Sequence, residues 1–217
     1  MKPAATRRDP VAEAVARIAA GGLVAFPTET LWGLGADARS EEAAARLRSW
    51  KVRGDDQPLS VLVTGPAALP GLGIEMGRLA RELADTYWPG PLTLVLRCSG
   101  RFAHGVARAD GALGVRCSPH PVAGSLARAL EAAGVGPITA TSLNRSGEAP
   151  AHTRAEAMLA CARGAGEPPL LFVADGLDAG GGRPSTVVDL TGEKPVVLRW
   201  GALGRDFLVP LLRGAME

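Results

Sequence analysis

Residues 21–63 read GGLVAFPTETLWGLGADARSEEAAARLRSWKVRGDDQPLSVLV, and this stretch decides the fold. The short apolar run at 23–26 predicts a buried strand, and the polar turn at 27–30 follows it directly. A helix then carries Lys51 and Arg53 to the start of the next strand. Ligand sites in open α/β sheets lie outside the carboxyl ends of strands. The two threonines, the glutamate and the two cations therefore predict a site for an anionic, polar substrate.

The rest of the chain alternates between helices and strands. Helical spacing of apolar residues, capping residues and short apolar runs bounded by Gly and Pro give the expected elements. Helices are expected at 11–20, from 40, at 77–87, at 120–134, from 153 and at 206–212, and strands at 23–26, 59–63, 92–97, 114–117, 137–140, 170–174, 186–190 and 196–200. The alternation predicts an α/β fold with a largely parallel or mixed sheet, whose last strands pair antiparallel. We expect a single domain over residues 1–217, with a core at about 11–201 and a C-terminal segment at 202–217.

Composition limits the class of protein further. The 217 residues are 47% apolar, which is enough for a sizeable core, and the formal net charge is +2. No apolar run is long enough for a transmembrane helix, and the N-terminal sequence MKPAATRRDP lacks the apolar core of a signal peptide. We therefore expect a cytoplasmic protein without membrane contact. The three cysteines are widely spaced and form no CxxC pair, which argues against a disulfide framework and a metal site.

Polar residues gather where the predicted strands end. The groups are Thr28-Glu29-Thr30, Lys51-x-Arg53, Thr141-Ser142-x-Asn144 and Ser185-Thr186, and Arg116 and Arg199 lie within strands. Long charged side chains within strands require solvent or a ligand. Hydroxyls, amides and several cations with a single carboxylate favour binding of a phosphate-bearing molecule over acid–base hydrolysis. A structural explanation also stays open for each group, such as local hydrogen bonds in a Thr-Glu-Thr turn or a solvated lysine at a helix end.

Six motifs cover roughly residues 21–201. They are PTETLWGLG, KVR-x(4)-PL, WPGPLTLVL, VRCSPHP, TSLNRSG and STVVDLT. In this order they resemble the YrdC/TsaC family of L-threonylcarbamoyladenylate synthases. The resemblance implies an α/β fold with a twisted sheet and a large, positively charged cavity. It also implies a nucleotidyltransferase that forms threonylcarbamoyl-AMP and pyrophosphate from L-threonine, bicarbonate or CO2, and ATP. The product would feed a threonylcarbamoyl-transferase complex that modifies adenosine 37 of tRNA.

The resemblance also assigns roles to residues. The catalytic signature of the family falls on Lys51, Arg53, Ser142 and Asn144. ATP contacts would fall on Arg53, Ser142 and Arg199, and threonine contacts on Thr30, Arg116 and Ser185. Cations placed around phosphates without a strong base suit such a transfer, because its catalysis is mostly positioning and charge stabilisation. Mg²⁺ is expected to accompany the substrate ATP, held mainly by phosphate oxygens and water.

Five positions depart from the family pattern. Trp32 stands in place of a common tyrosine, and Gln57 in place of a frequent asparagine. Leu62 replaces a histidine of many longer members, so we expect one threonine contact to be missing. Leu143 replaces a small alanine, and we expect it to crowd the pocket. Pro184 stands where glutamate is often found.

Two other functions remain as alternatives. An arginine-lined concave surface could hold tRNA or another RNA without chemistry, and binding would then weaken steeply with salt. The second alternative is a divergent paralogue that uses the same cavity for another carbamate. Threonine-dependent release of pyrophosphate from ATP discriminates between these two functions and the synthase.

Overall fold

Two sheets, rather than one, carry the strands. The computed structural model describes residues 9–52, 58–163, 167–172, 177–180 and 182–214. In this described part the first sheet has the strand order β6-β2-β1-β7 and the second has the order β3-β5-β4-β8-β9. Both sheets mix parallel and antiparallel pairs. The α/β class and the antiparallel pairing of β8 with β9 are as predicted, but the expected single sheet is corrected to two.

The elements follow the predicted order closely. The strands are β1 Val24–Pro27, β2 Trp32–Gly35, β3 Ser60–Leu62, β4 Leu92–Arg97, β5 Ala112–Arg116, β6 Thr141–Ser142, β7 Leu170–Leu171, β8 Thr186–Asp189 and β9 Val196–Arg199. The helices are α1 Pro10–Ala19, α2 Glu41–Lys51, α3 Arg78–Tyr87, α4 Pro121–Ala132, α5 Arg154–Ala162 and α6 Arg205–Gly214, with short 3₁₀ turns η1 Pro66–Ala68 and η2 Pro70–Leu72. Among the described helices, none has the length and apolarity that a membrane crossing requires.

Helix starts are fixed by capping side chains that are visible in the sequence. The Asp9 side chain, just before the first residue of α1, accepts a hydrogen bond from the amide of Val11. The Ser40 side chain accepts from the amide of Ala43, the third residue of α2. The α5 helix, expected from residue 153, begins with a capping box in which the side chains of Thr153 and Glu156 each accept from the other's amide. Each such cap satisfies amides that the first helical turn leaves without partners.

The first sheet is buried on both faces, which explains the uninterrupted apolar run of β1. Val24 and Phe26 point toward α1 and α4, where they pack with Ile18 and Leu126 in the smaller core cluster. Ala25 points to the opposite face and belongs to the larger core cluster. Alternate residues of a strand face opposite sides, so both core clusters need apolar residues here.

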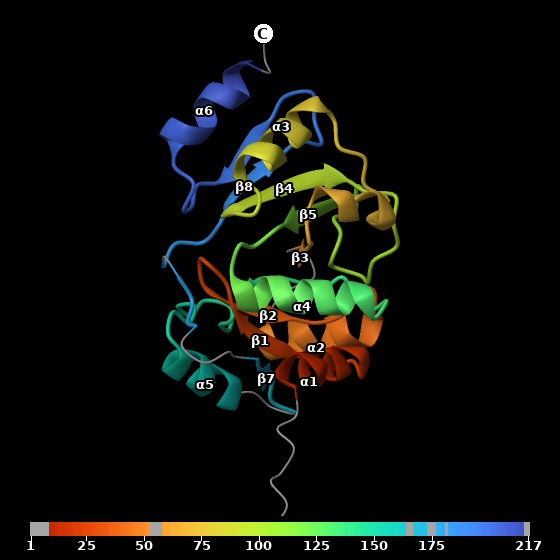
Figure 1. Ribbon diagram of the computed structural model, residues 1–217, viewed down its shortest axis with the longest axis vertical. Helices are drawn as coiled ribbons and strands as arrows, with labels where there is room; N and C mark the ends of the chain where they lie inside the picture. The colour runs from red at the N-terminus through yellow and green to blue at the C-terminus, as the bar shows by residue number, and fades with distance from the viewer. Residues whose placement is uncertain (1–8, 53–57, 164–166, 173–176, 181, 215–217) are drawn as a thin grey trace, which may run out of the picture.

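The second sheet has one core face and one polar face. Leu92, Leu94 and Leu96 of β4 belong to the larger core cluster together with residues of α3 and α6, the two helices above this sheet in Figure 1. The intervening residues Thr93 and Val95 line a cavity instead. The LTLVL sequence of β4 therefore separates the core from the cavity.

Three local expectations differ from the structure. Strand β2 was not predicted, because its Gly33 and Gly35 are unfavourable in strands. Both glycines permit close packing: a Cβ on Gly35 would lie 2.4 Å from the side chain of Ile138, and one on Gly33 would lie 3.1 Å from the ring of Phe26. The strand expected at 137–140 is displaced to β6, since Ile138 makes only an isolated bridge. Residues 66–76, where no helix or strand is expected, contain η1 and η2.

Candidate active site

A cavity of about 650 Å³ lies between the two sheets. This volume is in the range of small-molecule sites. Arg108, Arg116 and Arg199 line it, and no Asp or Glu does so among the described lining residues. The polar face of the second sheet bounds one side of the cavity, and Thr28 and Thr30, which follow the carboxyl end of β1, line another part of it.

One row of residues across the second sheet forms the cationic floor of the cavity. Strand pairing sets Arg116 of β5 opposite Thr93 of β4, Thr93 opposite Val187 of β8, and Val187 opposite Arg199 of β9. All four residues line the cavity. Paired residues of neighbouring strands share a face, so the register brings together two arginines that are 83 positions apart (199 − 116) in the sequence.

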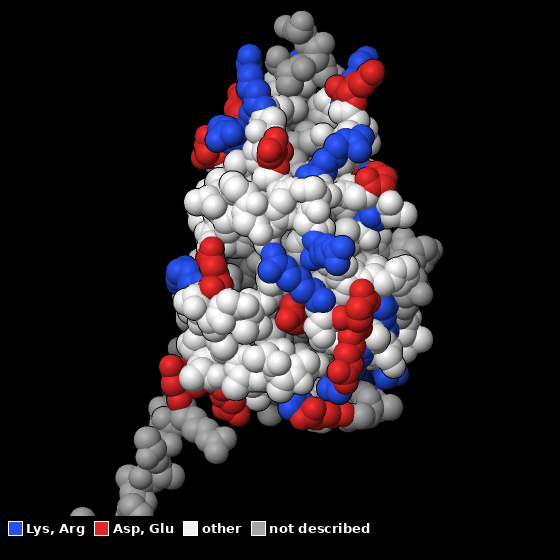
Figure 2. Space-filling model, turned by 90° about the vertical axis from the view of Figure 1, so that its right-hand side faces the viewer, with Lys and Arg blue, Asp and Glu red and all other residues white. Residues whose placement is uncertain are grey.

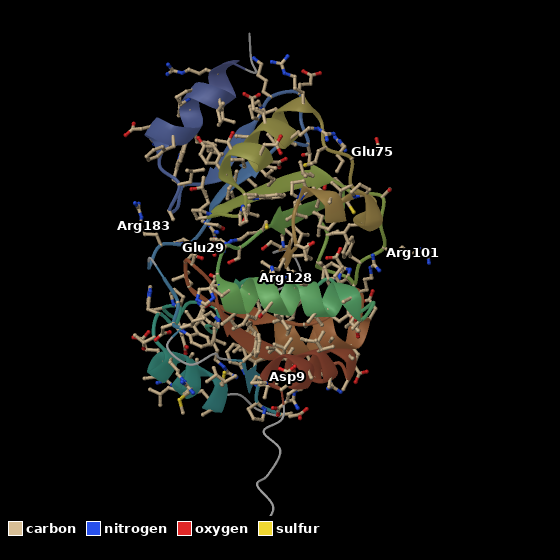
Figure 3. The ribbon with its side chains drawn as sticks, in the orientation of Figure 1. Asp9, Glu29, Glu75, Arg101, Arg128 and Arg183 are labelled. Atoms are coloured by element: carbon tan, nitrogen blue, oxygen red, sulfur yellow. The ribbon has the colours of Figure 1, made fainter. Side chains whose placement is uncertain are left out.

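The β1–β2 turn holds its own conformation and reaches across to the second sheet. The Thr28 hydroxyl donates to the Leu31 carbonyl over 2.7 Å and accepts from the amides of Thr30 and Leu31. Arg116 donates through Nη2 to Glu29 Oε1 and to Thr30 Oγ1, each over 2.7 Å. In Figure 3 Glu29 lies at the tip of the turn, where the two halves of the molecule meet. Thr30 and Arg116, both predicted threonine contacts, are therefore in direct contact with each other.

Arg116 keeps one donor without a partner. Its Nε is buried and has no hydrogen-bond partner among the described residues. An unsatisfied buried donor destabilises a fold by about 1–3 kcal/mol, and such groups need an explanation. Burial keeps Nε away from the cavity, so the contact that Arg116 offers to an anion comes from the part of the side chain that lines the cavity.

Ser185 forms hydrogen bonds with two residues of the cavity floor, Arg199 and Thr93. Arg199 donates to the Ser185 carbonyl through Nε and Nη2 over 3.1 and 2.9 Å, and to Ser185 Oγ over 3.1 Å. The Ser185 hydroxyl also lies 2.9 Å from Thr93 Oγ1. Burial lowers the pKa of Arg199, and the nearby Arg116 guanidinium lowers it further. The two guanidinium groups face the same cavity and repel each other. An anion bound between them would offset this repulsion.

The predicted Lys51, Ser142 and Asn144 also converge, but in an unexpected way. Lys51 is 2% exposed, and its ammonium donates to the Ser142 carbonyl over 2.6 Å and to the carbonyl and Oδ1 of Asn144 over 2.9 and 3.1 Å. Ser142 Oγ donates to Asn144 Oδ1 over 2.6 Å. Of these three residues Ser142 lines the cavity, whereas Lys51 and Asn144 lie behind it. Lys51 thus orders the loop that presents Ser142. The fourth signature residue, Arg53, lies outside the described residues, as does Gln57.

The other departures from the family pattern have identifiable positions. Leu143 is fully buried in the larger core cluster and does not line the cavity, so the expected crowding is wrong. Leu62 pairs with Arg116 in the register but packs in the smaller core cluster. Pro184 lines the cavity. The Trp32 ring also lines it, and its indole N–H donates to Asp178 Oδ1 over 2.7 Å.

Sequence reasoning missed Arg108 and His152 as lining residues. Arg108 donates to Asp110, Asp189 and Thr191, so its guanidinium joins the loop before β5 to the end of β8. The pair Arg108 and Asp110 was visible as a local Arg-x-Asp sequence, but nothing local indicates Asp189. Only the register of the second sheet brings that carboxylate to Arg108.

A family model and curated proteins match most of this chain. The Sua5/YciO/YrdC family model, described as "Telomere recombination", matches residues 16–201. A curated protein of Mycobacterium tuberculosis (strain CDC 1551 / Oshkosh) is 38% identical over 205 residues, which are 93% of this chain and 88% of that protein. The threonylcarbamoyl-AMP synthase of Halorhodospira halophila is 39% identical over 157 residues, which are 71% of this chain and 78% of that protein.

Solved structures extend the comparison to the fold. The Pyrococcus abyssi Sua5 protein, crystallised in complex with L-threonine, superposes with a TM-score of 0.81 at 34% identity, over 93% of this chain and 57% of that one. This chain therefore spans less than two thirds of that relative. Escherichia coli YciO has a TM-score of 0.75 at 23% identity, over 91% and 92% of the two chains, and shows the shared fold. The family-model match and the identity to full-length relatives establish that the chain belongs to the Sua5/YciO/YrdC family.

Proposed function

We propose that this chain is a threonylcarbamoyl-AMP synthase, which converts L-threonine, bicarbonate or CO2, and ATP into threonylcarbamoyl-AMP and pyrophosphate. The observation that carries the proposal is that Arg116 and Arg199 line one cavity together with Ser142, and that no Asp or Glu lines it among the described residues. The activity named for the H. halophila relative and the L-threonine in the P. abyssi structure support it.

The chemistry asks for positioning more than for a strong base. The threonine amine adds to CO2 and loses a proton to solvent, which gives a carbamate, and a carbamate oxygen then attacks the α-phosphorus of ATP. The bond from that phosphorus to the bridging oxygen breaks, and pyrophosphate leaves with the electron pair. Cations that hold both reactants in line and stabilise the leaving charge are what such a transfer requires.

The described residues divide into two groups around this reaction. Arg116, Thr30 and Ser185 are assigned to threonine, with the Arg116 guanidinium on its carboxylate. Ser142 and Arg199 are assigned to the nucleotide and the carbamate. Lys51 and Asn144 shape the loop that carries Ser142 and place a positive charge behind it. Arg53 completes the catalytic signature on the strength of the sequence motif.

Mg²⁺ is proposed to arrive with ATP. In the described ranges no group of three or more His, Cys, Asp or Glu side chains could hold a metal ion. Mg²⁺ commonly keeps several waters and binds through substrate phosphates. We therefore assign its coordination to phosphate oxygens and water.

The biological setting is proposed on the same basis. Threonylcarbamoyl-AMP would pass to a cytoplasmic threonylcarbamoyl-transferase complex that modifies adenosine 37 of tRNA. Direct tRNA contact is the weaker proposal for this chain. Figure 2 shows basic and acidic side chains interspersed on the face in view, whereas backbone binding of nucleic acid favours a basic patch or stripe.

The deciding experiment measures pyrophosphate release from ATP with bicarbonate and Mg²⁺, with and without L-threonine. Release should depend on threonine and fall by about 10²-fold or more in Lys51→Ala, because the Ser142 loop loses its support. Lys194→Ala is the matched control, since this lysine is exposed. Binding of ATP without threonine-dependent release would favour a paralogue that acts on another carbamate. Failure to bind ATP would favour the RNA-binding alternative.

A further inference from the structure

Glu29 joins the β1–β2 turn to Arg116 and to the residues that follow β5. Its two carboxylate oxygens are both occupied: Oε1 accepts from Arg116 Nη2 over 2.7 Å, and Oε2 accepts from the Ser118 hydroxyl. The side chains of Glu29 and Arg116 are only 18% and 11% exposed. Ser118 Oγ in turn accepts from the amide of His120, the N-cap of α4. The carboxylate is thus anchored to the second sheet and to α4.

The turn that carries Glu29 is also held from its other side. The amide of Gly180 donates to the Thr28 carbonyl over 3.0 Å, and the amide of Gly182 donates to the Thr30 carbonyl over 3.1 Å. A Cβ on Gly180 would lie 2.6 Å from the Glu29 carbonyl oxygen, so the two backbones are in direct contact. Glu29 therefore has little freedom to move away from Arg116.

Arg116 is consequently limited to one orientation. Its Nη2 is shared between Glu29 and Thr30, and its Nε is buried without a hydrogen-bond partner in the described part of the chain. Because Arg116 also lines the cavity, a carboxylate that enters the cavity meets a guanidinium whose orientation the protein has already set. A guanidinium presents its donors in a fixed fork, so fixing one edge also fixes the position of whatever binds the other.

We propose that Glu29 is a positioning residue, which holds Arg116 so that the guanidinium sets the placement of the substrate amino acid in the cavity. This inference rests on the synthase function proposed above and adds a specificity determinant to it. Threonine and serine differ by one methyl group. A site can discriminate between them only when it holds the rest of the amino acid in one position. Discrimination of one such group is worth about 10–200-fold.

A plain structural role is the competing explanation, because Glu29 also joins the two sheets. A merely destabilised enzyme has a smaller active fraction, which lowers the apparent kcat for both amino acids equally. The ratio of kcat/KM for L-threonine to that for L-serine does not depend on the active fraction. This ratio is therefore the readout.

Glu29→Gln removes the charge and one acceptor oxygen while keeping the side-chain length. We expect the threonine-to-serine ratio to fall about 10-fold or more, with the KM for ATP changed less than about 2-fold. Ser118→Ala releases only one carboxylate oxygen and should lower the ratio by a few-fold. Glu42→Gln is the matched control, because it breaks the exposed Glu42–Arg46 ion pair of α2, and it should leave the ratio unchanged.

Each outcome is decisive. An unchanged ratio in a folded Glu29→Gln enzyme that binds ATP with normal stoichiometry overturns the positioning role and leaves the synthase function standing. If Glu29→Gln does not fold, Ser118→Ala becomes the test, and an unchanged ratio in that variant would overturn the proposal. A wild-type protein without threonine-dependent pyrophosphate release overturns the proposed function and this inference together.

Discussion

Two arginines line the same cavity in opposite states. At one end, Arg108 donates through Nε to Asp110 over 3.0 Å, through Nη1 to Asp189, and through Nη2 to Asp110 and to Thr191 over 2.5 and 3.2 Å. At the other end, Arg116 contacts one carboxylate and one hydroxyl among the described residues, and it also lines the cavity. Two carboxylates neutralise the first guanidinium, whereas one carboxylate faces the second, which is therefore the better cation for a ligand.

The donors of the two guanidinium groups distinguish a structural cation from a binding one in a shared cavity. Local sequence does not show which arginine is structural, because the partners Asp189 and Glu29 lie 81 and 87 positions away along the chain. The state of their donors does, since a saturated guanidinium can bind an anion only by breaking existing bonds. We therefore expect changes at the two ends to have different consequences.

The largest effect is expected from Arg116→Lys. Lysine keeps the charge and can still pair with Glu29, but it lacks the second donor edge. We expect kcat/KM for threonine to fall about 10²–10³-fold, the equivalent of about 3–4 kcal/mol. The same exchange at the other end, Arg108→Lys, should change kcat/KM less than about 3-fold. Equal losses in the two variants, measured by steady-state kinetics, would show that the distinction between the ends is wrong.

The second prediction concerns the backbone behind Ser185. A Cβ on Gly201 would lie 2.1 Å from the Pro184 carbonyl oxygen and 2.6 Å from Ser185 backbone atoms. Gly201→Ala should therefore displace the wall that carries Ser185. Overpacking of this kind costs about 1–3 kcal/mol, or about 2–4 °C in Tm per kcal/mol for a chain of this size, and kcat/KM for threonine should fall about 10-fold.

Gly71→Ala is the control for this change, because a Cβ at Gly71 meets no atom within 4 Å. Thermal unfolding and kinetics of the two alanine variants would be compared directly. If Gly201→Ala matches Gly71→Ala in both measurements, the backbone at Pro184 and Ser185 accommodates the added Cβ without cost, and the prediction is wrong.

Local sequence patterns predicted many of the helices and strands, but they did not predict how the strands pair into two sheets. The caps at Asp9, Ser40 and Thr153 and the apolar run of β4 are readable within a few residues, because capping and burial are local patterns. The second sheet as a separate layer was not readable, because strand pairing depends on distant residues. Strand β2 was hidden by glycines whose benefit appears only when Phe26 and Ile138 are in place.

The site divides in the same way. The motifs placed Thr30, Arg116 and Ser185 correctly at one cavity. They did not indicate that Lys51 donates to backbone carbonyls, since such a contact joins a helix end to a loop more than 90 positions away. The saturation of Arg108 was equally hidden, because Asp189 reaches it only through the register of β4 with β8.

The third prediction tests the end of the cavity at Arg108, whose Nε, Nη1 and Nη2 all donate to carboxylates. Asp189→Asn keeps an acceptor for Thr191 but removes the charge that faces Arg108. The two side chains are 13% and 29% exposed, so we expect a loss of about 1–2 kcal/mol in the free energy of unfolding, as for a hydrogen bond to a charged group. The kcat/KM of the folded enzyme should change less than about 3-fold. Denaturant unfolding and kinetics check both numbers, and a loss of activity without a loss of stability would move Arg108 into the binding machinery.

The smallest effect is expected from acid titration of Asp110. The hydrogen bond from Arg108 lowers the pKa of Asp110 from its ordinary 3.8 to about 2. Because the folded-state pKa is below the unfolded value, the contribution to stability is fully present above about pH 4 and is lost as the pH falls through about 2. The Tm of the wild type should therefore exceed that of Asp110→Asn by a small, constant amount near pH 5, and this gap should close between pH 4 and pH 2. Thermal melts across this range measure it; a gap that stays constant down to pH 2 would mean that Asp110 does not help to saturate Arg108.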